Sequence, residues 1–178
     1  MIKVGAHRGA SGWAPENTMA AFELAIDKGA DLIEFDVQLT RDQVAVVIHD
    51  EWVDRTSNGH GRVCDLAWQE LKTMDFGSYR GAEFTGCRLP TLDEVLELGA
   101  GNCQMNIEIK NGPVYYPQIE DIIIDRIKAH HCREQVIISS FDHHAISRCH
   151  RLDPGVRLAY LIAHRPLEMA GMVPAFRL

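Results

Sequence analysis

Two kinds of hydrophobic pattern alternate along the chain. Short apolar and β-branched runs predict strands at 2–6, 31–38, 44–49, 104–110, 135–140 and 156–162. Segments with apolar residues at helical spacing lie between most of these runs, at 18–28, 91–98, 118–129 and 145–152. Strands that alternate with helices are typical of a parallel sheet covered by helices, so the pattern predicts an α/β fold.

The predicted helices carry recognisable end signals. Asn17 and Thr18 can cap the helix over 18–28, and Thr91 with Glu94 has the spacing of a capping box. In the segment 118–129 the apolar residues at helical spacing are Ile119, Ile122, Ile123 and Ile127. We expect these side chains to form the buried stripe of that helix.

The alternation stops between residues 51 and 90, where the sequence is rich in glycine and charge. About 40 residues are too many for a plain connection in a compact domain, so we interpret 51–90 as a small insertion. The 178 residues are enough for one hydrophobic core and too few for two. We therefore expect a single domain over 1–178 that contains this insertion.

The charge balance excludes some partners. The chain has 18 Lys and Arg against 25 Asp and Glu, a formal net charge of −7, and no basic run, so nucleic acid is not expected as a partner. No apolar stretch approaches the roughly 18 residues of a membrane span, and the N-terminal residues lack the layout of a secretory signal. We expect a cytoplasmic protein without stable membrane insertion. Its five cysteines have no CxxC spacing, which indicates reduced thiols.

Two of the predicted strands carry a polar face. Period-two alternation places these residues on it: Glu34, Asp36 and Gln38 in one strand, and Asn106, Glu108 and Lys110 in the other. Carboxylates in a buried parallel strand need compensation. One interpretation is internal ion pairs, such as Glu108 with Lys110. The other is that Glu34, Asp36 and Glu108 enclose one divalent cation, which an all-oxygen ligand set would make Mg²⁺ or Ca²⁺ rather than zinc.

Two histidines lie at the carboxyl ends of predicted strands. His7 and Arg8 follow the first strand and His49 ends the third, and ligands of α/β folds bind where strands end. A pair of imidazoles can divide acid and base work near neutral pH. Arg8 and Lys110 add positive charge for an anionic substrate. Together with a cation, these groups predict cleavage of a phosphoric ester.

Five sequence motifs, in this order, resemble the glycerophosphodiester phosphodiesterases of the bacterial cytoplasmic type, within the phospholipase-C-like phosphodiesterase superfamily. The motifs are HRGASGWAPENT at 7–18, EFDVQLTRDQVAVVIHD at 34–50, DRTSNGHG at 54–61, LPTLDEVL at 89–96 and NIEIK at 106–110. The similarity extends from residue 2 to about residue 162.

The resemblance implies a TIM-type (β/α)₈ barrel with a small insertion after the third strand. It also implies hydrolysis of glycerophosphodiesters to sn-glycerol 3-phosphate and an alcohol, with one divalent cation. By matching position it implies the following roles: His7 and His49 as the general acid/base pair, Glu34, Asp36 and Glu108 as metal ligands, Arg8 and Lys110 as phosphate-binding residues, and Glu16 and Asn17 as supporting residues.

The chain departs from the family pattern in length. Six predicted strands fall short of eight, and a complete barrel typically takes about 250 residues, so we expect an incomplete barrel of about six βα units. Its open edges would suit a homo-oligomer that covers them.

Three other functions remain open from the sequence. A lipid phosphodiesterase of the lysophospholipase D or sphingomyelinase D kind would share these residues but favour an apolar rim. An inactive truncated fragment could serve only for binding or assembly, although its intact histidines and carboxylates argue against decay. A metal-dependent sugar isomerase or aldolase would explain the carboxylates but not the paired histidines or the cations.

Overall fold

The computed structural model of the protein describes residues 2–163, so the part of the predicted domain beyond residue 163 lies outside it. The strands are β1 (Gly5–His7), β2 (Leu32–Leu39), β3 (Ala45–Val47), β4 (Gln104–Ile109), β5 (Val136–Ser140) and β6 (Arg157–Tyr160). The helices are α1 (Met19–Asp27), α2 (Trp68–Leu71), α3 (Leu92–Gly99), α4 (Ile119–Ala129) and α5 (His143–Leu152). Short 3₁₀ turns lie at Val63–Asp65, Ala82–Phe84 and Arg133–Gln135.

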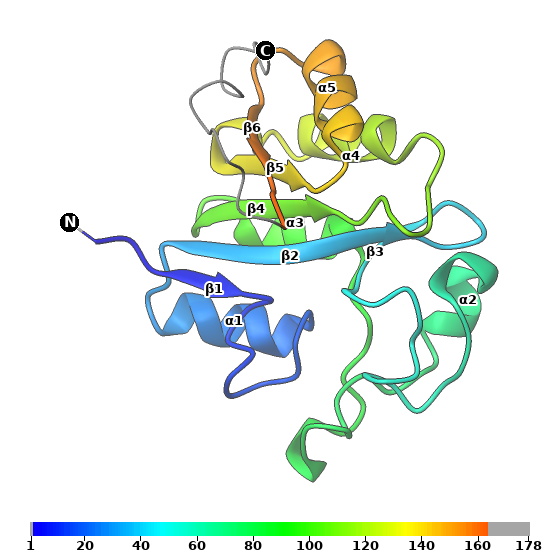
Figure 1. Ribbon diagram of the computed structural model, residues 1–178. Coiled ribbons are helices and arrows are strands. Elements are labelled where there is room, and N and C mark those ends of the chain that lie inside the picture. The colour runs from blue at the N-terminus through cyan, green and yellow to red at the C-terminus, as the bar shows by residue number, and fades with distance from the viewer. Residues whose placement is uncertain (1, 164–178) are drawn as a thin grey trace.

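The strands form one sheet in which five strands are parallel. Their order is β1-β2-β4-β5-β6, so each parallel strand lies beside the next one in the chain (Figure 1). A sheet that proceeds in one direction in this way, with a helix in each crossover, is the arrangement of a TIM-type barrel rather than of a doubly wound fold. The described residues supply five of the eight parallel strands, which confirms the expected incomplete barrel.

The third strand differs from the expectation in direction. We predicted 44–49 as a further parallel strand, but β3 is antiparallel to β2, with Val37 opposite Val47 and Leu39 opposite Ala45. The connection is a tight turn in which the Thr40 N–H donates to the Val44 carbonyl at 3.0 Å. A parallel partner would need a crossover of a dozen or more residues, which this turn cannot provide. Hydrophobic alternation alone does not report strand direction.

Alternate residues of the long strands point to opposite faces, as predicted. The apolar face packs against the helices and is almost completely buried: Ile33, Phe35, Val37, Met105, Ile107 and Ile109. Phe35 meets Phe22 of α1 edge to face, with ring centroids 5.7 Å apart. In α4 the buried stripe contains Ile119, Ile123 and Ile127 as predicted, with Ile124 added and Ile122 only partly buried. The other face of the strands carries the polar residues.

Both predicted helix caps are present. Thr18 caps α1, and in α3 the Thr91 Oγ1 accepts from the Glu94 N–H at 3.3 Å while the Glu94 carboxylate accepts from the Thr91 N–H at 2.7 Å. We expect Thr91→Ala to lower the free energy of unfolding by about 1 kcal/mol, because it leaves a helix-terminal N–H without its acceptor. Urea denaturation measures the change. Glu97→Ala, at an exposed position of the same helix, is the control, and an equal loss there would contradict the capping explanation.

The segment 51–90 has an apolar cluster of its own. The cluster combines residues of this segment with two residues of the β3 region: Val46, Ile48, Val53, Val63, Leu71, Phe76 and Leu89. The segment lies at the end of the sheet where the parallel strands finish (Figure 1). Its position therefore brings it close to the loops that follow β1 and β3.

Two further expectations concern cysteines and membrane spans. All five cysteines are free thiols. Among the described residues, no helix combines the length and the apolar character that crossing a membrane requires.

Candidate active site

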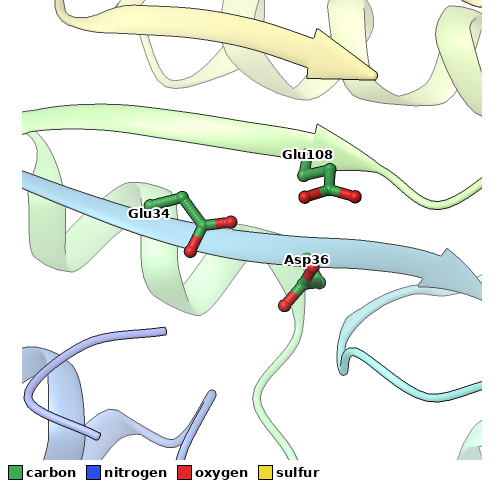
Figure 2. A group of neighbouring side chains, drawn as sticks. All are labelled: Glu34, Asp36 and Glu108. Atoms are coloured by element: carbon green, nitrogen blue, oxygen red, sulfur yellow. The ribbon is translucent and has the colours of Figure 1, made fainter. Parts of the chain in front are cut away.

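Three carboxylates from two neighbouring strands meet on the polar face of the sheet. Glu34 and Asp36 project from β2 and Glu108 from β4, and Figure 2 shows the three side chains gathered at the facing edges of these strands. One oxygen of each lies within 4.8 Å of the others. Asp36 and Glu108 are register partners, and paired residues on adjacent parallel strands lie side by side on the same face. The sheet register thus brings together residues that are 72 positions apart.

Burial and mutual repulsion change the protonation of this cluster. Burial and, after it, the neighbouring Asp36 carboxylate raise the pKa of Glu34 to about 7. The Arg8 backbone N–H, which donates to Glu34 Oε2 at 3.0 Å, acts in the opposite direction. Without a cation, Glu34 is therefore partly protonated near neutral pH.

Two cationic side chains flank the carboxylates. The Lys110 Nζ donates to Glu108 Oε1 at 2.9 Å and lies 3.7 Å from Asp36 Oδ1. The Arg8 Nε lies 3.5 Å from Asp36 Oδ2 without a hydrogen bond, and the Asn17 amide donates to the same oxygen at 2.9 Å. The internal ion pair between Glu108 and Lys110 is therefore present. It does not exclude a cation, because three carboxylates still outnumber the two positive charges.

The donor set fits a hard divalent cation. Asp36 is completely buried, and its Oδ1 has no hydrogen-bond partner among the described residues. The Asn106 Oδ1, on the same face of β4, is likewise buried without a donor in this part of the chain. Buried acceptors are normally satisfied, and a bound ion is one way to satisfy them. Since carboxylate and amide ligands offer only oxygen, the residues suit Mg²⁺ or Ca²⁺.

The loop after β1 holds Arg8 and Asn17 in an uncommon backbone conformation. Both residues have positive φ values, 58° for Arg8 and 56° for Asn17. Gly9, between them, has a φ of 76°, and a Cβ there would lie 2.7 Å from the Ala21 carbonyl carbon. Only glycine permits this close approach of the loop to α1. Backbone strain of this kind concentrates at functional sites, which agrees with the contacts that both side chains make to Asp36.

The two histidines reach the carboxylate cluster from different elements. His7 ends β1, is register partner of Glu34, and has its Nε2 3.8 Å from Glu34 Oε2. Its side chain is 69% exposed. His49 follows β3, and the antiparallel direction of β3 brings it back along β2, where the Ile48 N–H donates to the Asp36 carbonyl at 2.9 Å.

Side chains that the sequence left without a role fix the His49 segment. The Gln38 amide nitrogen donates to the carbonyls of Ile48, His49 and Asp50 at 3.0, 2.9 and 2.8 Å. Its Oε1 accepts from the Tyr116 hydroxyl at 2.6 Å. The period-two pattern placed Gln38 on the polar face of β2, but its partners depend on the hairpin, which that pattern did not predict.

Glu16 connects the first loop to the segment 51–90. Its carboxylate accepts from Arg8 Nη1 at 2.9 Å and from Arg55 Nη1 and Nη2 at 2.9 and 2.8 Å. These two arginines lower the pKa of Glu16, Arg55 more than Arg8. The Arg55 Nε also donates to Asp50 at 2.6 Å. Sequence reasoning placed Arg55 in the DRTSNGHG motif but gave it no function.

Two cavities adjoin Lys110. One, of about 330 Å³, is lined by Lys110, His49, Glu51, Trp52 and Pro113 among others. The second, of about 450 Å³, extends from Glu108 and Lys110 to Tyr115 and Phe141. Both open at the carboxyl ends of the strands, which is where ligands bind in barrels of this type.

Comparison with known proteins agrees with this geometry. Residues 7–175 match the family model described as the glycerophosphoryl diester phosphodiesterase family. A glycerophosphodiester phosphodiesterase of Caldanaerobacter subterraneus subsp. tengcongensis is 50% identical over 97% of this chain and 73% of its own length. One of Bacillus altitudinis is 43% identical over 98% of this chain and 74% of its own.

The fold agrees as well. The structure of an Oleispira antarctica phosphodiesterase in complex with the product sn-glycerol-3-phosphate superposes with a TM-score of 0.89 at 30% identity, over 98% of this chain and 72% of the other. The chain therefore spans about three quarters of the length of these relatives. The resemblance found in the five motifs is confirmed, and the chain belongs to the glycerophosphoryl diester phosphodiesterase family.

Proposed function

We propose that the protein hydrolyses glycerophosphodiesters to sn-glycerol 3-phosphate and an alcohol, with one divalent cation, Mg²⁺ or Ca²⁺. The observation that carries the proposal is the cluster of Glu34, Asp36 and Glu108. The buried Asp36 Oδ1 of this cluster has no hydrogen-bond partner among the described residues, and the side chains of Arg8 and Lys110 lie beside it. The product named for the Oleispira antarctica relative supports the substrate class. We propose one domain over 1–178, with 51–90 as an insertion that contacts the first loop.

The proposed roles follow from position. Glu34, Asp36 and Glu108 would hold the cation, which supplies positive charge against the developing charge on the phosphoryl oxygens. Arg8 and Lys110 would bind the phosphate, since both already lie beside Asp36. Glu16 and Asn17 would support the site by orienting Arg8 and Asp36.

The two histidines would carry the protons. One of His7 and His49 takes the proton of the attacking oxygen, and the other gives one to the leaving alcohol oxygen. His49 is suited to a directed transfer, because its Nδ1 lies 2.7 Å from Asp50 Oδ1 and its other nitrogen remains for the substrate.

The deciding experiment measures release of glycerol 3-phosphate from glycerophosphocholine and glycerophosphoethanolamine, with Mg²⁺, with Ca²⁺ and with EDTA. We expect release with a divalent cation and none with EDTA. A folded chain that releases nothing under any of these conditions would contradict the proposed activity, and would favour a binding or assembly fragment.

Cation affinity is expected to depend on pH through Glu34. The pKa of Glu34 is raised to about 7, so below that pH a cation must displace its proton. We expect the affinity to fall about tenfold per pH unit below about pH 7, and to level off above it. Titration calorimetry with Mg²⁺ or Ca²⁺ at several pH values measures the slope. Glu34→Gln should bind more weakly and lose this slope, whereas an unchanged slope would assign the proton to another group.

A lipid phosphodiesterase is the second candidate. Four exposed aromatic side chains lie in segments that follow strands, with exposed fractions from 49 to 71%: Trp13, Trp52, Tyr115 and Phe141. Tryptophan and tyrosine suit the boundary between water and lipid. This aromatic rim favours an acylated substrate, so lysophosphatidylcholine belongs in the same assay. Faster turnover of that lipid than of glycerophosphocholine would support this candidate.

We also propose that a second copy of the chain covers the open sheet edges. Within the described residues, β1 pairs with β2 alone, and Val4 beside β1 is 59% exposed. An unpaired strand edge next to apolar side chains favours association. Light scattering coupled to size-exclusion chromatography gives the molar mass, and a strictly monomeric chain would contradict the proposal.

A further inference from the structure

We propose that Arg55 is a positioning residue for His49: it holds Asp50, and Asp50 orients the His49 ring. The inference rests on the proposed function of His49 in proton transfer. Arg55 belongs to the segment 51–90, so the inference also gives this segment a part in the chemistry.

The orientation begins with Asp50. Its Oδ1 lies 2.7 Å from His49 Nδ1, and its Oδ2 accepts from Arg55 Nε at 2.6 Å. A carboxylate can only accept, so this contact places the proton of a neutral His49 ring on Nδ1 and leaves Nε2 with a lone pair. Arg55 and, less strongly, His49 lower the pKa of Asp50 to about 2, so Asp50 accepts as a carboxylate at any pH where the enzyme would work.

Arg55 is itself held by Glu16. Its two terminal nitrogens donate to the two oxygens of Glu16 at 2.9 and 2.8 Å, while Nε is directed to Asp50. Each nitrogen of the guanidinium therefore has a carboxylate partner. Glu16 is fixed in turn by the Arg8 side chain and by its own N–H, which donates to the Tyr79 hydroxyl at 3.1 Å. The orientation of His49 is thus tied to the loop that follows β1.

This arrangement requires arginine rather than positive charge alone. Lysine has one nitrogen at the end of a flexible stem and cannot contact Asp50 and both Glu16 oxygens in a fixed geometry. The Arg55 side chain is 47% exposed, and exposed ion pairs contribute little to stability. We therefore expect its loss to affect turnover more than folding.

The kinetic test compares Arg55→Lys and Arg55→Ala with the wild type in the full chain, on glycerophosphocholine with saturating cation. We expect both variants to lower kcat about 10- to 100-fold with little change in KM, because a misplaced proton-transfer group affects the reacting state. Arg62→Ala is the matched control, since Arg62 is a half-exposed arginine of the same segment and pairs with Asp65. Wild-type kcat in Arg55→Lys would overturn the proposal in favour of a charge effect.

A double-mutant cycle with His49→Ala shows whether Arg55 acts through His49. We expect Arg55→Ala to lower kcat little further once His49 is absent. If Arg55→Ala lowers kcat as much in the His49→Ala protein as in the wild type, the proposal is overturned, and Arg55 would act through Glu16 and Arg8 instead.

A spectroscopic measurement separates this proposal from the proposed function. In ¹⁵N-histidine-labelled protein, with the His49 signal assigned by His49→Gln, we expect the Nδ1–H tautomer in the wild type and a mixture of tautomers in Arg55→Ala. This result does not require activity. If the wild type turns over no diester but the tautomer shifts, the proposed function fails and the positioning of His49 stands. An unchanged tautomer would refute the positioning.

Discussion

Replacing His49 by alanine is expected to lower kcat for glycerophosphocholine about 100- to 10,000-fold, the range that a positioned general acid or base contributes. His49 is only 31% exposed, is held by Asp50 and lines the cavity that also contains Lys110. His7→Ala should have an effect of the same order, because the His7 Nε2 lies 3.8 Å from Glu34 Oε2. Release of glycerol 3-phosphate with saturating cation measures both.

His131→Asn is the control for the histidine variants. His131 is exposed, follows α4 and lies before β5, so it belongs to the amino-terminal edge of the strands, away from the cluster. Asparagine tolerates its positive φ of 53°. We expect normal turnover in this variant. Retention of activity within about threefold in His49→Ala would contradict the acid/base assignment, since no general acid or base contributes so little.

Asp36→Asn is expected to reduce activity by more than about 100-fold and to weaken cation binding, because even outer residues of metal sites typically contribute 10- to 100-fold. Asparagine keeps the shape of the side chain but removes the charge that lies between Arg8, Lys110 and the other carboxylates. Titration calorimetry with Mg²⁺ and with Ca²⁺ measures the affinity directly. Activity at saturating cation then shows whether higher concentration restores turnover.

The control for Asp36 is Asp27→Asn, an exposed carboxylate at the end of α1. This substitution changes net charge equally but leaves the cluster intact, so both affinity and turnover should stay normal. Full activity of Asp36→Asn, or undiminished activity of the wild type in excess EDTA, would rule out the cation site.

Much of the fold follows from local patterns. The alternation in 31–38 and 104–110 predicted β2 and β4 together with the face that each residue occupies, because side chains in any strand alternate whatever surrounds them. The caps at Thr18 and Thr91 were equally local. Strand direction does not follow from local pattern. The prediction of a parallel strand at 44–49 was wrong because parallel and antiparallel strands show the same alternation.

Some residues of the candidate site could likewise be predicted from local pattern, and others could not. Five motifs were sufficient to predict the family. Glu34, Asp36 and Glu108 were selected because they occupy alternating positions of otherwise apolar strands, where burying a carboxylate is costly. Their mutual distance required the register between β2 and β4. Gln38, Asp50 and Arg55 could not be given roles, because their partners depend on the hairpin and on the packing of 51–90.

Local patterns in the chain are sufficient to predict the α/β class, the polar faces of two strands and the residue types of the candidate site, because these depend on neighbours only a few positions away. Three features become visible only in the folded chain: the reversal of β3, the burial that raises the pKa of Glu34, and the contacts from Glu16 through Arg55 to His49. The reversal of β3 depends on the tight turn at Thr40–Val44 and on pairing with β2. The burial of Glu34 and the contacts of Arg55 arise where segments distant in the chain pack together.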